Sequence, residues 1–168
     1  YQFRNNYINE INENISDIFK NYIKNQKISI KYESDYHLND KDKLINTLKR
    51  NRNKEINLGM TNFGIHRDDF TFYQNDNNAK EYSSQGIQKL IVLAMKLSEV
   101  TIFIKKYNIY PILLLDDLFS ELDEKNRNNI FKSLDKSIQI FITTTDLKNI
   151  NKKIVEKAKI YNLDEKEN

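Results

Sequence analysis

The sequence predicts an α/β fold with a mostly parallel sheet that helices flank. Between residues 84 and 143 a long helical period, a short apolar run, a second helical period and a second apolar run alternate, which is the order of parallel strands joined by crossovers. The first apolar run, 111–115, ends in two adjacent acids, typical of a strand that delivers carboxylates to the ligand-binding edge of a sheet. We expect this strand to be central and covered on both faces.

Residues 1–24 predict a helix. Its apolar residues recur at alternating steps of three and four, the spacing of a seam against another helix: Ile8, Ile11, Ile15, Ile18 and Tyr22. No capping residue precedes the pattern. We expect residues 1–26 to form the returning helix of a helical arm, and an ordinary amphipathic surface helix is the alternative.

Residues 26–33 alternate apolar and polar side chains, which predicts a half-exposed strand. A helix is expected to start at Asn39 and Asp40 and to end in a basic run, Lys49, Arg50, Arg52 and Lys54. Cations in a last helical turn complement the helix dipole, and contact with phosphate groups is the alternative role.

Residues 58–73 combine two glycines with a polar cluster. Gly59 and Gly64 flank a short apolar stretch, His66, Arg67, Asp68 and Asp69 follow, and Phe70 and Phe72 alternate as in a strand. The cluster is either a functional site at a strand junction or an ion-pair turn that closes a hairpin across 74–78. His66 taken alone favours the structural role, because no second histidine lies near enough to form a metal pair.

The longest helical period covers residues 87–104, and its start is the informative part. Ser84 can cap the first turn, and Gly86 leaves the backbone open to an approaching group. Free N–H groups and the positive end of the dipole favour an anion there, and Lys89 adds a charge. A serine-capped core helix is the alternative.

Asp116 and Asp117 follow the apolar run, so their side chains diverge and can take separate roles. One can hold Mg²⁺ directly or through water, and the other can accept a proton from an attacking water. Asp123 is expected to cap the next helix. The strand at 138–143 ends in threonines whose hydroxyls should line the same edge as Asp116. A further strand is expected at 158–161 and a frayed tail at 164–168.

Composition narrows the class of protein. Without cysteine the chain has neither disulfides nor a thiolate metal site. No apolar run approaches the roughly 20 residues that cross a bilayer, so a cytoplasmic protein without membrane contact is expected. The formal charge of +3 is compatible with a nucleic-acid partner but does not require one.

Three motifs together resemble an ABC-type ATPase head. They are Ser-Ser-Gln-Gly-Ile-Gln at 83–88, Leu-Leu-Leu-Asp-Asp at 113–117 with Ser-Glu-Leu-Asp at 120–123, and Phe-Ile-Thr-Thr-Thr at 141–145, which look like the signature, the Walker B strand with its D-loop, and the switch strand. Gly-Ile-His-Arg-Asp-Asp at 64–69 resembles the RecF family of DNA replication and repair ATPases. The chain departs from that family's pattern at Ile65, Ile87 and Lys89.

The resemblance implies that residues 27–163 are the C-terminal lobe of such a head. The sequence contains no Gly-x-x-x-x-Gly-Lys-Ser/Thr loop, which in the family lies in an N-terminal segment. ATP and Mg²⁺ are therefore the expected cofactors only together with that segment, and this chain by itself is expected to be inactive.

The resemblance also implies residue roles. Asp116 would act on Mg²⁺, through water, and Asp117 would deprotonate or position the attacking water. The signature and D-loop would reach the nucleotide of a second subunit through Ser84, Gln85, Gly86, Gln88, Ser120 and Asp123. Thr143 and Thr144 would form the switch strand, and His66 and Arg67 a site specific to the family.

Finally, the resemblance implies an ATP-dependent homodimer that engages DNA at single-strand/double-strand junctions, works with RecR and RecO mediator proteins, and serves recombinational repair and replication-gap processing. Two alternatives remain open. One is a head of another ABC branch, such as an SMC-like protein or a transporter subunit. The other is a binding module of ABC shape without catalysis.

Overall fold

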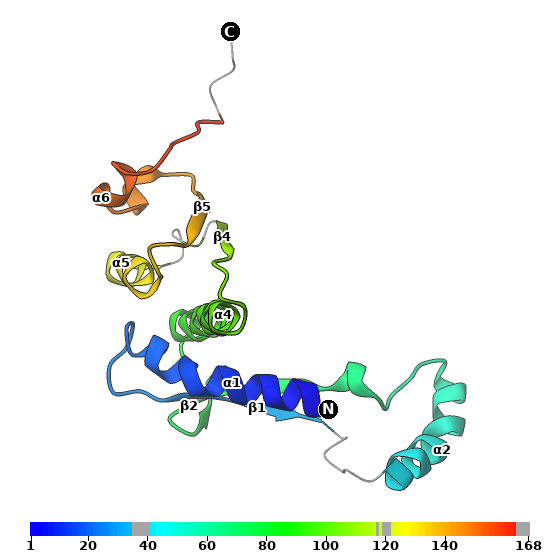
Figure 1. Ribbon diagram of the computed structural model, residues 1–168. Coiled ribbons are helices and arrows are strands. Elements are labelled where there is room, and N and C mark those ends of the chain that lie inside the picture. The colour runs from blue at the N-terminus through cyan, green and yellow to red at the C-terminus, as the bar shows by residue number, and fades with distance from the viewer. Residues whose placement is uncertain (35–40, 117, 119–121, 164–168) are drawn as a thin grey trace. The chain divides into compact units, whose positions relative to one another are not determined.

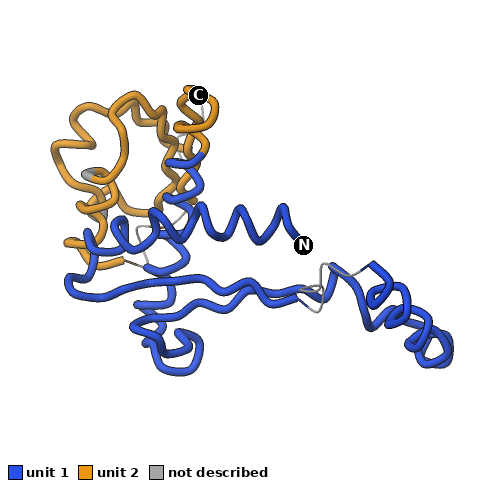
Figure 2. The backbone as a smooth tube through the Cα atoms, turned by 60° about the horizontal axis from the view of Figure 1, so that its bottom comes forward, with its two compact units in different colours: residues 1–102 blue, residues 103–168 orange. Residues whose placement is uncertain are grey.

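The computed structural model describes residues 1–34, 41–116, 118 and 122–163 (Figure 1). The chain divides into two compact units, Tyr1–Ile102 and Phe103–Asn168, coloured separately in Figure 2. The described strands form one antiparallel sheet in the first unit and one parallel sheet in the second. The α/β class and the parallel pairing are thus confirmed, and each unit is described by itself below.

The sheet of the first unit has the strand order β1-β2-β3. Strands β1 (Ile28–Glu33) and β2 (Asp69–Gln74) pair antiparallel along their whole length, from Ile28 opposite Gln74 to Glu33 opposite Asp69. β3 (Asn77–Asn78) closes a hairpin on β2. The two turn residues, Asn75 and Asp76, have φ of 48° and 68°, values that match the right-handed twist of hairpin strands.

Helix α1 (Gln2–Phe19) packs its apolar face on strand β1. Figure 1 shows it lying along this sheet. The buried face consists of Ile8, Ile11, Ile15 and Phe19. The prediction of a helix to about residue 24 is therefore corrected, because the helix ends at Phe19. Strand β1 is a partner that the predicted helix–helix seam did not include.

Polar side chains of α1 occupy the edge of β1 that β2 leaves open. Asn12 donates from Nδ2 to the Ile30 carbonyl (2.8 Å) and accepts from the Ile30 N–H (2.7 Å). Ser16 makes the same pair of bonds with the carbonyl and N–H of Ile28, at 2.7 and 3.0 Å. Helix side chains thus take the place of a neighbouring strand, which satisfies backbone groups that an edge would otherwise expose.

Replacing Asn12 by Ala is expected to weaken this edge by about 1–3 kcal/mol, because both polar groups of Ile30 lose their partner in a part-buried position. Hydrogen exchange followed by mass spectrometry should show faster exchange over residues 28–33. Asn6→Ala, at an exposed position of the same helix, is the control and should leave that exchange unchanged.

Helix α2 (Lys41–Leu58) ends later than predicted. Gly59 has φ of 64° and donates to the Ile56 carbonyl, while Met60 donates to the Glu55 carbonyl, the two bonds of a glycine-terminated helix. The basic run was predicted to end the helix, but a full turn follows Lys54. None of the eighteen residues of α2, all of which the structure describes, is buried.

Helices α3 (Ala79–Tyr82) and α4 (Gln85–Tyr107) complete the first unit, and α4 continues past its boundary. The buried residues of α4 are Leu90, Ile91, Leu93, Ala94, Leu97, Ser98 and Ile102. The expected burial on most sides is only partly met, since Val92 and Phe103 are exposed. Within the first unit α4 contacts α1 where the Tyr7 hydroxyl bonds Glu99. Burial of Tyr7 is the main cause that raises its pKa, and the charge of Glu99 is the second.

In the second unit β4 (Ile112–Asp116) and β5 (Gln139–Thr143) pair in parallel, and α5 (Glu124–Ser133) lies between them in sequence. Leu114 lies opposite Phe141 and is 72% exposed, and Phe141 is 51% exposed. The prediction that this strand is covered on both faces is therefore wrong for the described residues: Leu115 is buried, but the opposite face is bare.

The second unit continues into η2 (Leu147–Asn149) and α6 (Lys152–Val155). The strand predicted at 158–161 is absent. These residues form no strand, no described strand pairs with them, and Ile160 and Tyr161 are exposed. Among the described residues no helix combines the length and the apolar character needed to cross a membrane.

Candidate functional site

Asp116, the first acid of the pair predicted after β4, lies at the C-terminal edge of the parallel sheet. Asp116 is the last residue of β4, and the register places it opposite Thr143, the last residue of β5. The Thr143 hydroxyl donates to Asp116 Oδ1 at 2.5 Å, so this threonine lines the same edge as Asp116, as predicted. Asp117 lies outside the described residues.

Thr144 turns away from this edge toward its own loop. Its hydroxyl donates to the Asp146 carbonyl at 3.1 Å and accepts from the Asp146 N–H at 3.3 Å. The Asp146 carboxylate in turn caps η2 by accepting from the Lys148 N–H. Of the two predicted switch threonines, Thr143 bonds Asp116, whereas the bonds described for Thr144 stay within its own loop.

Asp123 caps helix α5 as predicted. Its Oδ1 accepts from the Asn126 N–H at 2.8 Å, and its Oδ2 accepts from the Asn126 side chain at 2.9 Å. The carboxylate thus orients the start of α5, and it remains exposed. Ser120, the other predicted D-loop residue, lies outside the described residues.

The predicted anion site is the start of α4. Ser84 is exposed, and its hydroxyl accepts from the Ile87 N–H at 3.4 Å, a long capping bond. Gly86 is exposed too, and a Cβ built on it would meet no described atom within 4 Å. Nothing in the described part of the chain requires a glycine there, which leaves the open backbone available to an external group.

Side chains from β2 and from α4 both bond the loop before α4. The Ser83 hydroxyl donates to the side-chain oxygen of Gln74 on β2, and Gln88 donates from Nε2 to the Ser83 carbonyl at 2.9 Å. Gln88 also reaches the Lys80 carbonyl at 3.3 Å. Gln88 was predicted to contact nucleotide, and in this structure its amide holds the loop that presents Ser84. Gln85 stands beside it, exposed.

The segment 64–69 forms an anchored turn, η1 (Ile65–Arg67), before β2. Arg4 donates to the Ile65 carbonyl at 2.7 Å and lies 3.5 Å from the Asp68 carboxylate, whose side chain is only 2% exposed. The Tyr32 hydroxyl donates to the same carboxylate. Burial, and then this bond, raises the pKa of Tyr32.

This anchoring leaves His66 and Arg67 exposed at the apex of the turn. His66 Nε2 lies 3.1 Å from the Thr61 carbonyl, a contact within the same loop. The structural reading of the cluster therefore applies to Asp68, while a functional site at His66 and Arg67 stays a prediction. Asp68 belongs to a buried ion-pair turn, and Arg67 is presented to solvent.

Three residues that position these sites gave no signal in the sequence: Arg4, Tyr32 and Gln74. Arg4 acts 64 residues away from Asp68, and Tyr32 acts 36 residues away. Gln74 looked like an ordinary polar residue at a strand end. Only the pairing of β1 with β2, and of α1 with β1, brings them to their partners.

The chemistry of the acid edge fits Mg²⁺ in part. A carboxylate beside a hydroxyl is the all-oxygen environment that Mg²⁺ prefers, and Mg²⁺ keeps several waters and uses few protein ligands. Among the described residues no group of three or more acids or histidines could hold a metal ion. Asp116 would therefore contribute one ligand, and substrate phosphates and water the others.

No family model matches the chain. Curated relatives do. The chain is 44% identical over 121 residues to the DNA replication and repair protein RecF of Lactobacillus johnsonii, a match that covers 72% of the chain and 32% of the relative. It is 34% identical over 145 residues to RecF of Macrococcus caseolyticus, covering 83% and 39%. The chain thus spans roughly a third to two fifths of these relatives' length.

Solved structures agree. The structure of the recombination mediator protein RecF-ATPrS in the RecFOR pathway superposes with a TM-score of 0.72 at 33% identity, covering 89% of the chain and 42% of that chain. The corresponding RecF-ATP structure gives a TM-score of 0.72 at 34% identity, covering 86% and 40%. The chain therefore belongs to the RecF family and corresponds to the C-terminal part of RecF.

Proposed function

We propose that the chain is the C-terminal part of a DNA-binding ATPase that dimerises on ATP and acts in recombinational DNA repair and replication-gap processing. The observation that carries the proposal is the bond of Asp116 to Thr143 at the shared edge of β4 and β5. An acid and a hydroxyl at the carboxyl ends of adjacent parallel strands lie where α/β sheets bind ligands.

In this proposal Asp116 supplies an oxygen ligand to Mg²⁺, which when bound offsets charge on the phosphates. Thr143 holds the Asp116 carboxylate in one orientation through its 2.5 Å bond. Asp117 accepts a proton from, or orients, the attacking water.

The start of α4 serves the partner's nucleotide. Ser84, Gln85 and the open backbone at Gly86 present donors and the positive end of a 23-residue helix, which suits a γ-phosphate held by a second subunit. Gln88 positions this loop from within, and Asp123 orients the start of α5. ATP would then act as a link between two copies, and hydrolysis would release it.

The bare face of β4 and β5 supports the view that a further part of the protein completes this site. Ile112, Leu114 and Phe141 expose apolar surface beside Asp116. Such contiguous apolar surface is typical of an interface. We propose that the part of RecF that this chain does not match covers this face and supplies the phosphate-binding loop. The dimer would act on DNA at single-strand/double-strand junctions together with RecR and RecO mediators.

The test is ATP turnover and association of the full-length protein, with and without DNA. The wild type should hydrolyse ATP and sediment as a dimer when ATP is present. Thr143→Val, which keeps the shape but removes the donor to Asp116, should lower turnover about tenfold. Thr61→Val, at an exposed loop position of the first unit, makes the same change away from this sheet edge and is the matched control. A wild-type protein that neither turns over ATP nor dimerises would overturn the proposal.

A further inference from the structure

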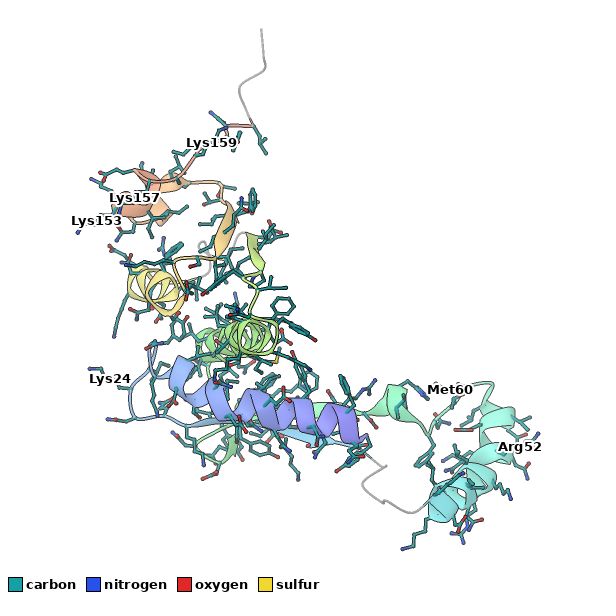
Figure 3. The ribbon with its side chains drawn as sticks, in the orientation of Figure 1. Lys24, Arg52, Met60, Lys153, Lys157 and Lys159 are labelled. Atoms are coloured by element: carbon teal, nitrogen blue, oxygen red, sulfur yellow. The ribbon has the colours of Figure 1, made fainter. Side chains whose placement is uncertain are left out.

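Helix α2 carries a clear excess of positive charge. It carries six lysines and arginines against two carboxylates, an excess of four, whereas the whole chain has 27 against 24, an excess of three. Lys49, Arg50, Arg52 and Lys54 are all exposed. Figure 3 shows Arg52 extending outward from the helix. Helix α2 is therefore one of two basic stretches of the chain; the other, residues 148–159, has five lysines against one glutamate.

The two carboxylates of α2 do not neutralise this run. Asp42 lies in the first turn, where a negative charge complements the helix dipole. Glu55 turns to the following loop, where its Oε1 accepts from the N–H groups of Asn62 and Phe63 at 2.8 and 3.0 Å. This bond also ties the end of α2 to the loop that leads to the anchored turn with Arg67.

We propose that α2 and Arg67 form one basic surface that binds the phosphate backbone of DNA. The surface comprises Arg50 and Lys54, which share one face of α2, and Arg67. This inference rests on the proposed function, which identifies DNA as the partner, and it adds the place where DNA binds. Two described acids lie close to Arg67 in sequence. The side chain of Asp68 is buried, and Asp69 is exposed.

The spacing of the cations suits an extended polyanion. Arg50 and Lys54 are four residues apart and so share one helix face, about 6 Å apart along the axis. Asparagines 46, 51, 53 and 57 add side-chain donors of the kind that contact phosphate and sugar oxygens. Such contacts hold a duplex in place without reading its sequence.

A membrane surface fits this helix less well. A helix that lies on a bilayer separates an apolar face from a charged one. In α2 the residue four positions after Leu48 and four before Ile56 is Arg52, so a guanidinium interrupts the apolar stripe. Arg52 would have to enter the apolar layer of a bilayer, which is unfavourable for a charged side chain, whereas contact with DNA phosphates makes no such demand.

The experiment measures binding of the full-length protein to a fluorescent 30-base-pair duplex of arbitrary sequence as the salt concentration rises. The double variant Arg50→Gln/Lys54→Gln should lower the slope of log affinity against log salt by about 2, and Arg67→Gln by about 1. Lys24→Gln, an exposed lysine in the connection after α1, removes the same charge outside the surface and should keep the wild-type slope (Figure 3).

Circular dichroism of each variant checks that the fold is intact. Wild-type slope in the double variant would overturn this inference, while ATP turnover and dimerisation of the wild type would still uphold the proposed function. Loss of turnover in the wild type would overturn the proposed function instead. Binding of the wild type to anionic phospholipid vesicles, lost in the double variant while duplex binding stays unchanged, would assign the surface to membranes and overturn the inference.

Discussion

Asp117→Asn in the full-length protein should lower ATP turnover by roughly 10²–10⁴-fold and leave ATP-driven dimerisation intact. Asparagine keeps the shape of the side chain but cannot take a proton from water, and general-base catalysis contributes a rate factor of this order. Phosphate release under saturating ATP measures turnover, and sedimentation with ATP measures the dimer. The dimer of the variant should also persist longer, because hydrolysis no longer dissolves it.

The hairpin turn offers a matched control for this substitution. Asp76→Asn makes the same chemical change at a residue with φ of 68°, a conformation that asparagine adopts readily. Its turnover should equal that of the wild type. Unchanged hydrolysis in Asp117→Asn would remove the residue from the role of base, and loss of the ATP-driven dimer would point to a role in nucleotide binding.

Strands and helices with strong local periodicity were predictable from the sequence. The α4 pattern, the alternation in β1 and the apolar runs of β4 and β5 each specify an element by themselves. The end of α2 was not predicted, although Gly59 is the common signal for a helix end. The basic run that ends at Lys54 is a weaker signal than the glycine, because cations stabilise a last turn without terminating a helix.

The partner of α1 could not be read from periodicity. A seam of isoleucines shows that one face is buried, but not whether a helix or a strand covers it. Asn12 and Ser16, polar residues beside that seam, identify the strand as a partner, because their side chains bond the backbone of β1. In the sequence such residues look like solvent-facing positions. The exposure of Leu114 could not be predicted from the sequence either. An apolar run indicates a buried strand whether the chain covers one face of that strand or both.

The acid edge was predictable, because parallel strands bring their carboxyl ends to one side of a sheet and the residue after each run is then fixed. Asp116 and Thr143 meet for this reason. The anchors of the 64–68 turn were not, because Arg4 and Tyr32 reach Asp68 only through tertiary pairing. The sequence motifs therefore predicted the candidate functional groups, whereas the residues that hold these groups in place could be identified only from the fold.

Ser84→Arg should abolish ATP-driven dimerisation of the full-length protein and leave ATP binding to each single copy intact. Ser84 and Gly86 are exposed at the start of α4, and nothing described in the chain fills the space at Gly86. A bulky cation there would block the approach of a second subunit's nucleotide. It would also replace a capping residue, a loss of about 1 kcal/mol that a folded domain tolerates.

Sedimentation with ATP and equilibrium binding of a fluorescent ATP analogue separate the two effects of Ser84→Arg. Ser137→Arg, at an exposed turn of the second unit, makes the same change away from α4 and should dimerise as the wild type does. A dimer that survives Ser84→Arg would show that the start of α4 does not act on the partner's nucleotide. Loss of binding in the single copy would place Ser84 at its own nucleotide instead. Dimer loss with ATP binding preserved is the result that only a site shared between two copies explains.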